Sequence, residues 1–149
     1  MIRVLLITSL LLITGCDSFY GITREAQISR VIDYTCIEQS LNSVQGVTDI
    51  KYQLVGSRSS PTSDKDSLYQ SHRYHYKADN VNGFVSILMN DKGTNVTQFS
   101  RTNNRPIPQE AIDKIRPIMD KIQIAIADSC KVSNFSALVS ETCRKVKCD

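Results

Sequence analysis

The sequence predicts an α+β domain: an N-terminal helix, a four-stranded antiparallel meander, a long C-terminal amphipathic helix and a short terminal helix. Two observations support this fold class. Apolar residues recur at helical spacing near both ends of the chain, whereas the region between residues 47 and 101 has strand patterns separated by turn signals. Because helices and strands are segregated along the chain, an α+β arrangement is favoured over a parallel α/β one.

The first predicted helix runs from about residue 24 to residue 44. Thr23 can cap it, and Glu25 in its first turn would interact favourably with the helix dipole. Two apolar stripes at helical spacing predict burial on a broad front, and Gly46 ends the helix. The stripes are Ile28, Val31, Ile32 and Cys36, and Ile37, Leu41 and Val44.

Four strands are predicted next. The first alternates polar and apolar side chains, as a strand with one solvated face does. Asn82-Gly83 is a hairpin turn signal, and Asp91-Lys92-Gly93 makes another turn, so the strands should form an antiparallel meander. The predicted strands are residues 47–55, 68–78, 84–89 and 95–101.

The long C-terminal helix has the clearest periodicity in the chain. Pro108 suits the first turn of a helix, and an apolar stripe follows it, so this helix should pack on the sheet. Ser133 can cap the short terminal helix. The apolar stripe consists of Ala111, Ile112, Ile115, Ile118, Met119, Ile122, Ile126 and Cys130.

The first sixteen residues have the pattern of an exported chain. Arg3 precedes an apolar run over residues 4–13, whose length suits a secretory signal and falls short of the roughly 20 residues that a spanning helix needs. The run ends in Ile13-Thr14-Gly15-Cys16, with a small residue before a cysteine. This motif resembles the lipobox of bacterial lipoproteins, and the resemblance covers residues 1–17.

The resemblance implies that a signal peptide, residues 1–15, is removed and that Cys16 becomes S-diacylglycerylated and N-acylated, for example with palmitate. Residues 16–22 would be a lipidated tether and residues 23–149 a single domain. Asp17 resembles the inner-membrane retention signal of enteric-type lipoproteins, so the inner membrane, facing the periplasm, is favoured over the outer membrane. The alternative is an ordinary secretory signal, with Cys16 as a further disulfide partner.

Composition limits the class of partner. The 149 residues include 18 basic and 15 acidic side chains, for a formal net charge of +3, and removal of Arg3 would leave +2. This charge is too small to indicate a nucleic-acid partner. The chain after Cys16 is long enough for one domain with a core and too short for two.

Four further cysteines, Cys36, Cys130, Cys143 and Cys148, predict two disulfides in an oxidising compartment. Cys36 and Cys130 lie on the core-facing stripes of their helices, so a bridge between them would join the helices and leave Cys143 to pair with Cys148. Cys143 or Cys148 could instead reach Cys36 or Cys130. No CxxC spacing occurs, so we do not expect a metal site.

Residues 69–77 carry both histidines and are the most suggestive stretch for a site. Alternation on a strand places one set of side chains on each face, so the two histidines cannot chelate one metal from this strand alone. One set is His72, Tyr74 and Tyr76, and the other is Arg73, His75 and Lys77. The second set could bind an anion or an acidic partner. Alternatively, the tyrosines pack under helices and the basic face is merely solvated.

The sequence contains no G-x-S-x-G, P-loop, G-x-G-x-x-G or H-E-x-x-H motif, and it implies no cofactor. We therefore expect a non-catalytic binding module that contacts another envelope protein or component, for example as an inhibitor or immunity protein. Its binding surface would be the Arg73, His75 and Lys77 face or the polar loop 57–67. The alternatives are a small-ligand carrier or enzyme with a site near His72, Tyr74 and Tyr76, and a structural subunit of an envelope complex.

Overall fold

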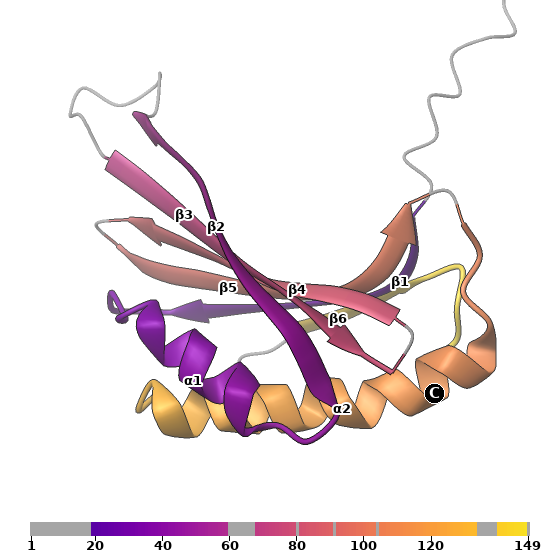
Figure 1. Ribbon diagram of the computed structural model, residues 1–149. Helices are drawn as coiled ribbons and strands as arrows, with labels where there is room; N and C mark the ends of the chain where they lie inside the picture. The colour runs from indigo at the N-terminus through magenta and orange to yellow at the C-terminus, as the bar shows by residue number, and fades with distance from the viewer. Residues whose placement is uncertain are drawn as a thin grey trace, which may run out of the picture.

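The computed structural model describes residues 19–59, 68–79, 81–90, 92–103, 105–133 and 140–148. Cys16, Asp17 and residues 60–67 of the predicted polar loop lie outside these ranges. The described residues form a six-stranded antiparallel sheet and two helices (Figure 1). In chain order these are β1 (Phe19–Ile28), α1 (Thr35–Ser43), β2 (Val47–Ser59), β3 (Leu68–Ala78), β4 (Val81–Asn90), β5 (Gly93–Asn103), α2 (Gln109–Ser129) and β6 (Ser140–Arg144).

The strand order is β2-β3-β4-β5-β1-β6, and every neighbouring pair is antiparallel. β2 to β5 are joined in order by hairpins. β1, the first strand, lies between β5 and β6, which are the last two strands of the described chain. β1 therefore joins the two ends of the described chain into one sheet. Among the described residues, neither helix is long and apolar enough to cross a membrane.

The predicted fold class is wrong. The sheet has six strands rather than four, and the predicted N-terminal helix is replaced by β1 and the much shorter α1. The physical reason lies in β1, where Ile22, Ala26 and Ile28 are buried at strand spacing but Arg24 is the fourth inward residue. Because a charged residue occupies a core position, the strand alternation of apolar residues in β1 is not visible in the sequence. The helical spacing that begins at Ile28 therefore led to the prediction of a helix.

The C-terminal end also differs from the prediction. In place of the short terminal helix, residues 140–144 form β6, which pairs with β1. Residues 134–139 of that predicted helix lie outside the described ranges. β6 is a short and polar edge strand with only Cys143 partly buried, so it lacks the apolar alternation by which a strand is recognised.

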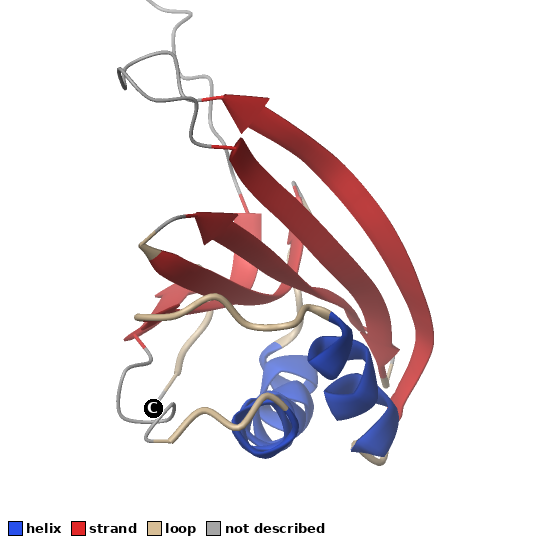
Figure 2. Cartoon of the chain, turned by 90° about the vertical axis from the view of Figure 1, so that its left-hand side faces the viewer, coloured by secondary structure: helices blue, strands red, loops and turns tan. Residues whose placement is uncertain are grey.

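Both helices pack on one face of the sheet and leave the other face open (Figure 2). Inward side chains of β1, β3 and β4 meet the apolar stripes of α1 and α2 in one core. Gly83 of β4 makes room in this core, because a Cβ atom there would lie 2.3 Å from Cζ of Tyr76 on the neighbouring strand. The largest fully buried side chains are Tyr74, Tyr76, Ile22, Ile37, Leu41, Ile87, Ile112, Ile115, Met119, Ile122, Ile126 and Val85.

The structure resolves the open question of cysteine pairing. Cys36 of α1 is bonded to Cys130, directly after α2, and the two Cα atoms lie 5.2 Å apart. Cys143 of β6 is bonded to Cys148, with Cα atoms 6.0 Å apart. The first bridge spans 94 residues and joins the helices beneath the sheet, so it restricts the unfolded chain much more than the second, which spans five.

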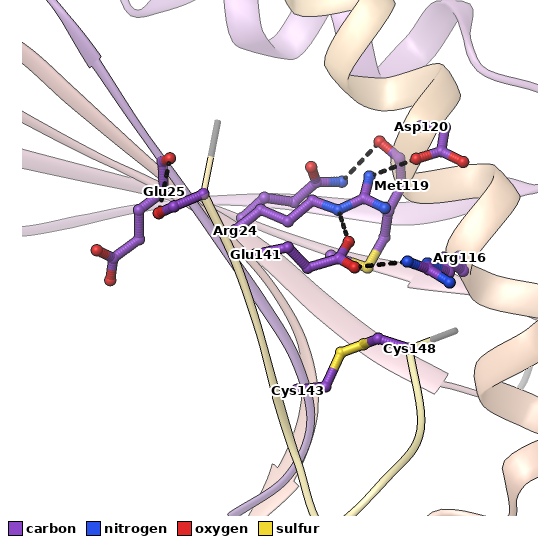
Figure 3. A network of polar contacts seen from close by, with 10 residues as sticks. Arg24, Glu25, Arg116, Met119, Asp120, Glu141, Cys143 and Cys148 are labelled. Atoms are coloured by element: carbon purple, nitrogen blue, oxygen red, sulfur yellow. Dashed lines mark hydrogen bonds and ion pairs between the residues drawn. A yellow bond between two sulfur atoms is a disulfide. The ribbon is translucent and has the colours of Figure 1, made fainter. Parts of the chain in front are cut away.

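A buried arginine connects β1, α2 and β6 (Figure 3). Arg24 is 5% exposed, and its guanidinium group lies 2.7 Å from a carboxylate oxygen of Asp120 in α2. Its Nε donates to Glu141 of β6, whose other carboxylate oxygen accepts a hydrogen bond of 2.8 Å from Arg116 of α2. The network therefore holds the edge strand β6 and the helix α2 on the same strand.

The substitution Arg24→Met should lower the free energy of unfolding by about 2 kcal/mol, less than a fully buried ion pair costs, because Asp120 is exposed and Glu141 keeps Arg116. Denaturant unfolding at fixed pH measures this change. The matched control is Lys114→Met, which breaks an exposed pair with Glu110 and should cost less than about 1 kcal/mol. Equal losses in the two variants would contradict the role assigned to Arg24.

Candidate binding face

The open face of the sheet is the surface on which a ligand or partner has access to several strands at once. Alternation decides which side chains it presents: in β4 the odd residues 81–89 are buried against the helices, so Phe84, Ser86 and Leu88 point the other way. In β3 the same rule places Arg73, His75 and Lys77 on the open face and the intervening residues in the core.

Arginine and phenylalanine side chains contact one another in a row across this face, and we call the set the Arg–Phe ladder. Arg73 lies over the ring of Phe84, with 4.5 Å between its guanidinium carbon and the ring centroid. Phe84 stacks on Phe99 of β5 at 4.2 Å between centroids. The ladder crosses β3, β4, β5, β1 and β6 and consists of Arg73, Phe84, Phe99, Arg101, Phe19 and Arg144.

The second half of the ladder is built around Phe19. The guanidinium carbon of Arg101 lies 4.6 Å from the centroid of Phe99 and 4.6 Å from that of Phe19. Arg144 of β6 lies 4.9 Å from the centroid of Phe19. Each ring thus orients a guanidinium group, and the hydrogen-bond donors at the edge of that group are left for carboxylate or phosphate oxygens.

The arginines of the ladder are not paired with a carboxylate of the described residues, although Glu25 lies on the same face and lines the hollow with Arg73 and Arg101. Among the described residues, none of Arg73, Arg101 and Arg144 forms an ion pair, whereas the inward Arg24 has two carboxylate partners. Nε of Arg73 also has no hydrogen-bond acceptor among the described side chains. The open face can therefore bind an anionic group without first breaking an internal ion pair.

The predicted row of Arg73, His75 and Lys77 lies on the open face, but only one of the three side chains carries a charge that is not paired within the described residues. Lys77 is paired with Asp49 at 2.7 Å. His75 shares a hydrogen bond of 3.0 Å with Gln53, and burial, followed by the charge of Arg73, holds its pKa below the usual value. His75 is consequently neutral at pH 7, and Arg73 is the member whose charge is available.

Phe19, Arg101 and Arg144 were not predicted from the sequence as members of this face. Arg101 ended a predicted strand and carried no signal of its own. Phe19 lay in a segment assigned to a tether, and Arg144 followed the residues assigned to the short terminal helix, so their position on a common sheet could not be inferred. The aromatic and β-branched residues Phe19, Tyr20, Ile22 and Thr23 are a local signal of strand structure there.

The middle of the open face is hollowed. A depression of about 600 Å³ lies between β1, β3, β4 and β5, and Arg73, Phe84, Phe99 and Arg101 contribute to its wall. Hydroxyl, amide and carboxylate side chains form most of the remaining wall, together with the apolar residues Ala26, Leu88 and Val96. The polar side chains include Ser71, Ser86, Asn95, Thr97, Gln27 and Glu25. Pockets for small apolar ligands are lined mainly by apolar side chains, so this polar hollow suits a charged, hydrogen-bonding partner better.

The alternative site near His72, Tyr74 and Tyr76 lies on the helix-covered side, within the core. Tyr74 and Tyr76 are 1% and 2% exposed, and burial raises the pKa of each hydroxyl to about 12. The ring of Tyr34 stacks on His72 at 3.9 Å, and a hydrogen bond of 2.7 Å joins the Tyr52 hydroxyl to Nδ1 of His72. These side chains pack against one another rather than line the hollow.

One group of potential metal ligands occurs among the described residues, formed by Glu141, Cys143 and Cys148. Because the two cysteines are joined in a disulfide, neither offers a thiolate. The two histidines lie on opposite faces of β3, so they do not share a ligand position. The residues near Glu141 therefore form a structural network rather than a metal centre.

Burial lowers the pKa of His72, so between its folded pKa and the ordinary value near 6.5 the unfolded chain binds more protons than the folded one. The free energy of unfolding should consequently fall as the pH decreases from about 7 to about 5. His72→Gln, which can still accept a hydrogen bond from Tyr52, should reduce this slope. Denaturant unfolding at several pH values measures it.

His75→Gln must be measured alongside His72→Gln, because the pKa of His75 is also lowered and this residue contributes to the pH dependence in the same direction. An unchanged slope in His72→Gln would show that the ring protonates equally well in both states.

Comparison of the chain with protein-family models, with curated protein sequences and with solved structures found no match.

Proposed function

We propose that the protein is a lipid-anchored, non-catalytic binding module of the bacterial cell envelope, and that its open sheet face binds an acidic envelope protein. Two lines of reasoning support the proposal. The lipobox-like motif ending at Cys16 indicates attachment to a membrane, facing the periplasm. The Arg–Phe ladder and the polar hollow beside it indicate a surface for a negatively charged partner.

The observation that carries the proposal is the uncompensated charge of the ladder. Three arginines lie on one face and form no ion pair with a described carboxylate, and their guanidinium groups rest on phenylalanine rings. Ordering these long side chains in advance reduces the entropy lost on binding. Arginine and aromatic side chains are also enriched among the residues that dominate protein interfaces.

The shape of the face favours a macromolecular partner over a small metabolite. The ladder crosses five strands, and strands are spaced about 4.8 Å apart, so its width alone is about 20 Å. The hollow lies within this span and offers hydroxyl and amide groups beside the arginines. An acidic protein surface can contact Arg73, the rings of Phe84 and Phe99 and these polar groups simultaneously.

The anchor is tested by Cys16→Ser. Without the thiol there is no thioether to diacylglycerol, so the variant should leave the membrane fraction of cells, whereas the unaltered chain should remain there. Fractionation followed by immunodetection measures this. Cys143→Ser with Cys148→Ser is the control, since it replaces a disulfide that closes only a short loop and leaves the proposed lipid site unchanged. Membrane retention of Cys16→Ser would contradict the anchor.

The binding face is tested by a photo-crosslinking residue at Ser86, which lies in the hollow and pairs with Arg73 across the strands. In intact cells it should yield one dominant adduct with an acidic envelope protein. The same residue at exposed Gln39 of α1 is the positional control and should not yield this adduct.

The charge dependence of that adduct is the decisive readout. Arg73→Gln should reduce its yield by about tenfold, as expected for one charge-assisted hydrogen bond. Lys121→Gln makes the same charge change on α2 and should leave the yield unchanged. An adduct equally strong from Gln39, or one insensitive to Arg73→Gln, would overturn the assignment of the open face.

A further inference from the structure

One end of the sheet lies close to the proposed lipid anchor. Only Asp17 and Ser18 separate Cys16 from Phe19, the first residue of β1. Three successive Cα–Cα steps span at most about 11 Å, so the acylated residue must lie within that distance of Phe19 in any conformation. We call this the anchor end of the sheet, and β5 and β6 also finish there.

Two arginines of the ladder meet at the anchor end. Arg101 of β5 and Arg144 of β6 both pair with Gly21, one from each side of β1. Glycine has no side chain to separate them, and a Cβ atom at this position would lie 2.3 Å from the Ser100 carbonyl oxygen. The two guanidinium carbons lie 4.6 and 4.9 Å from the centroid of the same Phe19 ring.

This arrangement has the chemistry of a phosphate contact. Guanidinium groups bind phosphate oxygens through two parallel hydrogen bonds, and neither arginine is engaged by a described carboxylate. Lys145 follows Arg144 in the chain and adds positive charge to this end of the sheet from the helix side, where its amino group lies 4.7 Å from the centroid of the Tyr20 ring. Basic residues within a Debye length of an anionic bilayer are attracted to it.

We propose that Phe19, Arg101 and Arg144 contact the phosphate-bearing headgroups of anionic phospholipids and hold the domain on the bilayer in one orientation. The inference rests on the proposed lipid anchor, which keeps these side chains near the headgroups. Tethering gives the contact a high effective concentration, so two arginines suffice where they would not retain a free protein.

The orientation follows from the strand register. β1, β5 and β6 meet the membrane at the anchor end, whereas the end of β2 and the start of β3 lie at the opposite end of the sheet (Figure 1). The row of Glu25, Thr97, Ser86 and Arg73 crosses the sheet six residues from Phe19, about 20 Å along the strand. The part of the hollow around Arg73 and Ser86 is thus held off the bilayer and accessible to a partner from the side, whereas Arg101 forms the wall nearest the anchor end.

The test uses the full acylated chain, reconstituted in vesicles, with a fluorescent amino acid at Thr142 of β6. The vesicles contain phosphatidylethanolamine with either phosphatidylglycerol or phosphatidylcholine, and a quencher is attached to a small fraction of headgroups. Time-resolved emission separates the quenched, membrane-contacting population from the unquenched one. We expect the contacting population to dominate only in the phosphatidylglycerol vesicles and to decline at high salt.

Arg101→Gln with Arg144→Gln should lower the ratio of contacting to free populations by about 25-fold, because each basic residue near an anionic surface contributes roughly a factor of five. Lys92→Gln with Lys121→Gln makes the same charge change elsewhere and should leave the ratio unchanged. Circular dichroism and thermal unfolding check that both double variants fold. Arg101→Lys with Arg144→Lys, which keeps the charge, should retain most of the contact.

Equal quenching in the two vesicle types, or no difference between the two Gln double variants, would overturn the inference. Inorganic phosphate at millimolar concentration distinguishes the sources of phosphate. If it abolishes the contact, the site binds soluble phosphate rather than a bilayer, and the inference is wrong. Failure of the anchor is seen separately, as membrane retention of Cys16→Ser in cells.

Discussion

The burial of Arg24 is the constraint on which the arrangement of the sheet depends. A guanidinium group inside the core is tolerated only when carboxylates accompany it, and here they come from Asp120 in α2 and Glu141 in β6. This requirement brings the helix and the last strand to β1. Arg144, three residues after Glu141, is thereby placed on the open face. The ion pairs of Arg24 on the helix side of the sheet thus help to position Arg144 on the open side.

The two faces of the sheet differ in how their aromatic side chains are kept from water. On the helix side, the large rings of Tyr74 and Tyr76 fill a close-packed core, and Gly83 leaves room for the ring of Tyr76. On the open side, phenylalanine rings remain near solvent, where their exposure would normally be unfavourable. The arginine side chains lie over these rings, cover their apolar surface and keep charged ends in water. The ladder is therefore stable before any partner binds.

The length of the strands separates the proposed contacts in space. Phe19, Arg101 and Arg144 lie at the anchor end, whereas Arg73 lies about 20 Å further along the strands. A hydrogen-bonded sheet changes its length little, so the fold fixes the separation of these two groups. In the proposed anchored state, this fixed separation would suit a module that meets its partner at a defined height above the bilayer.

The sequence by itself determined local periodicity: the alternation that divides β3 into a basic face and an aromatic face, and the apolar stripe of α2. It also limited the cysteine pairs without choosing among them. Only the tertiary structure decided that β1 and β6 are strands and that the ladder exists. Arg24 interrupts the alternation of β1, and its burial is possible only beside Asp120 and Glu141, 96 and 117 residues further along the chain. Such long-range pairing leaves no local pattern, so the face that it creates could not be inferred from neighbouring residues.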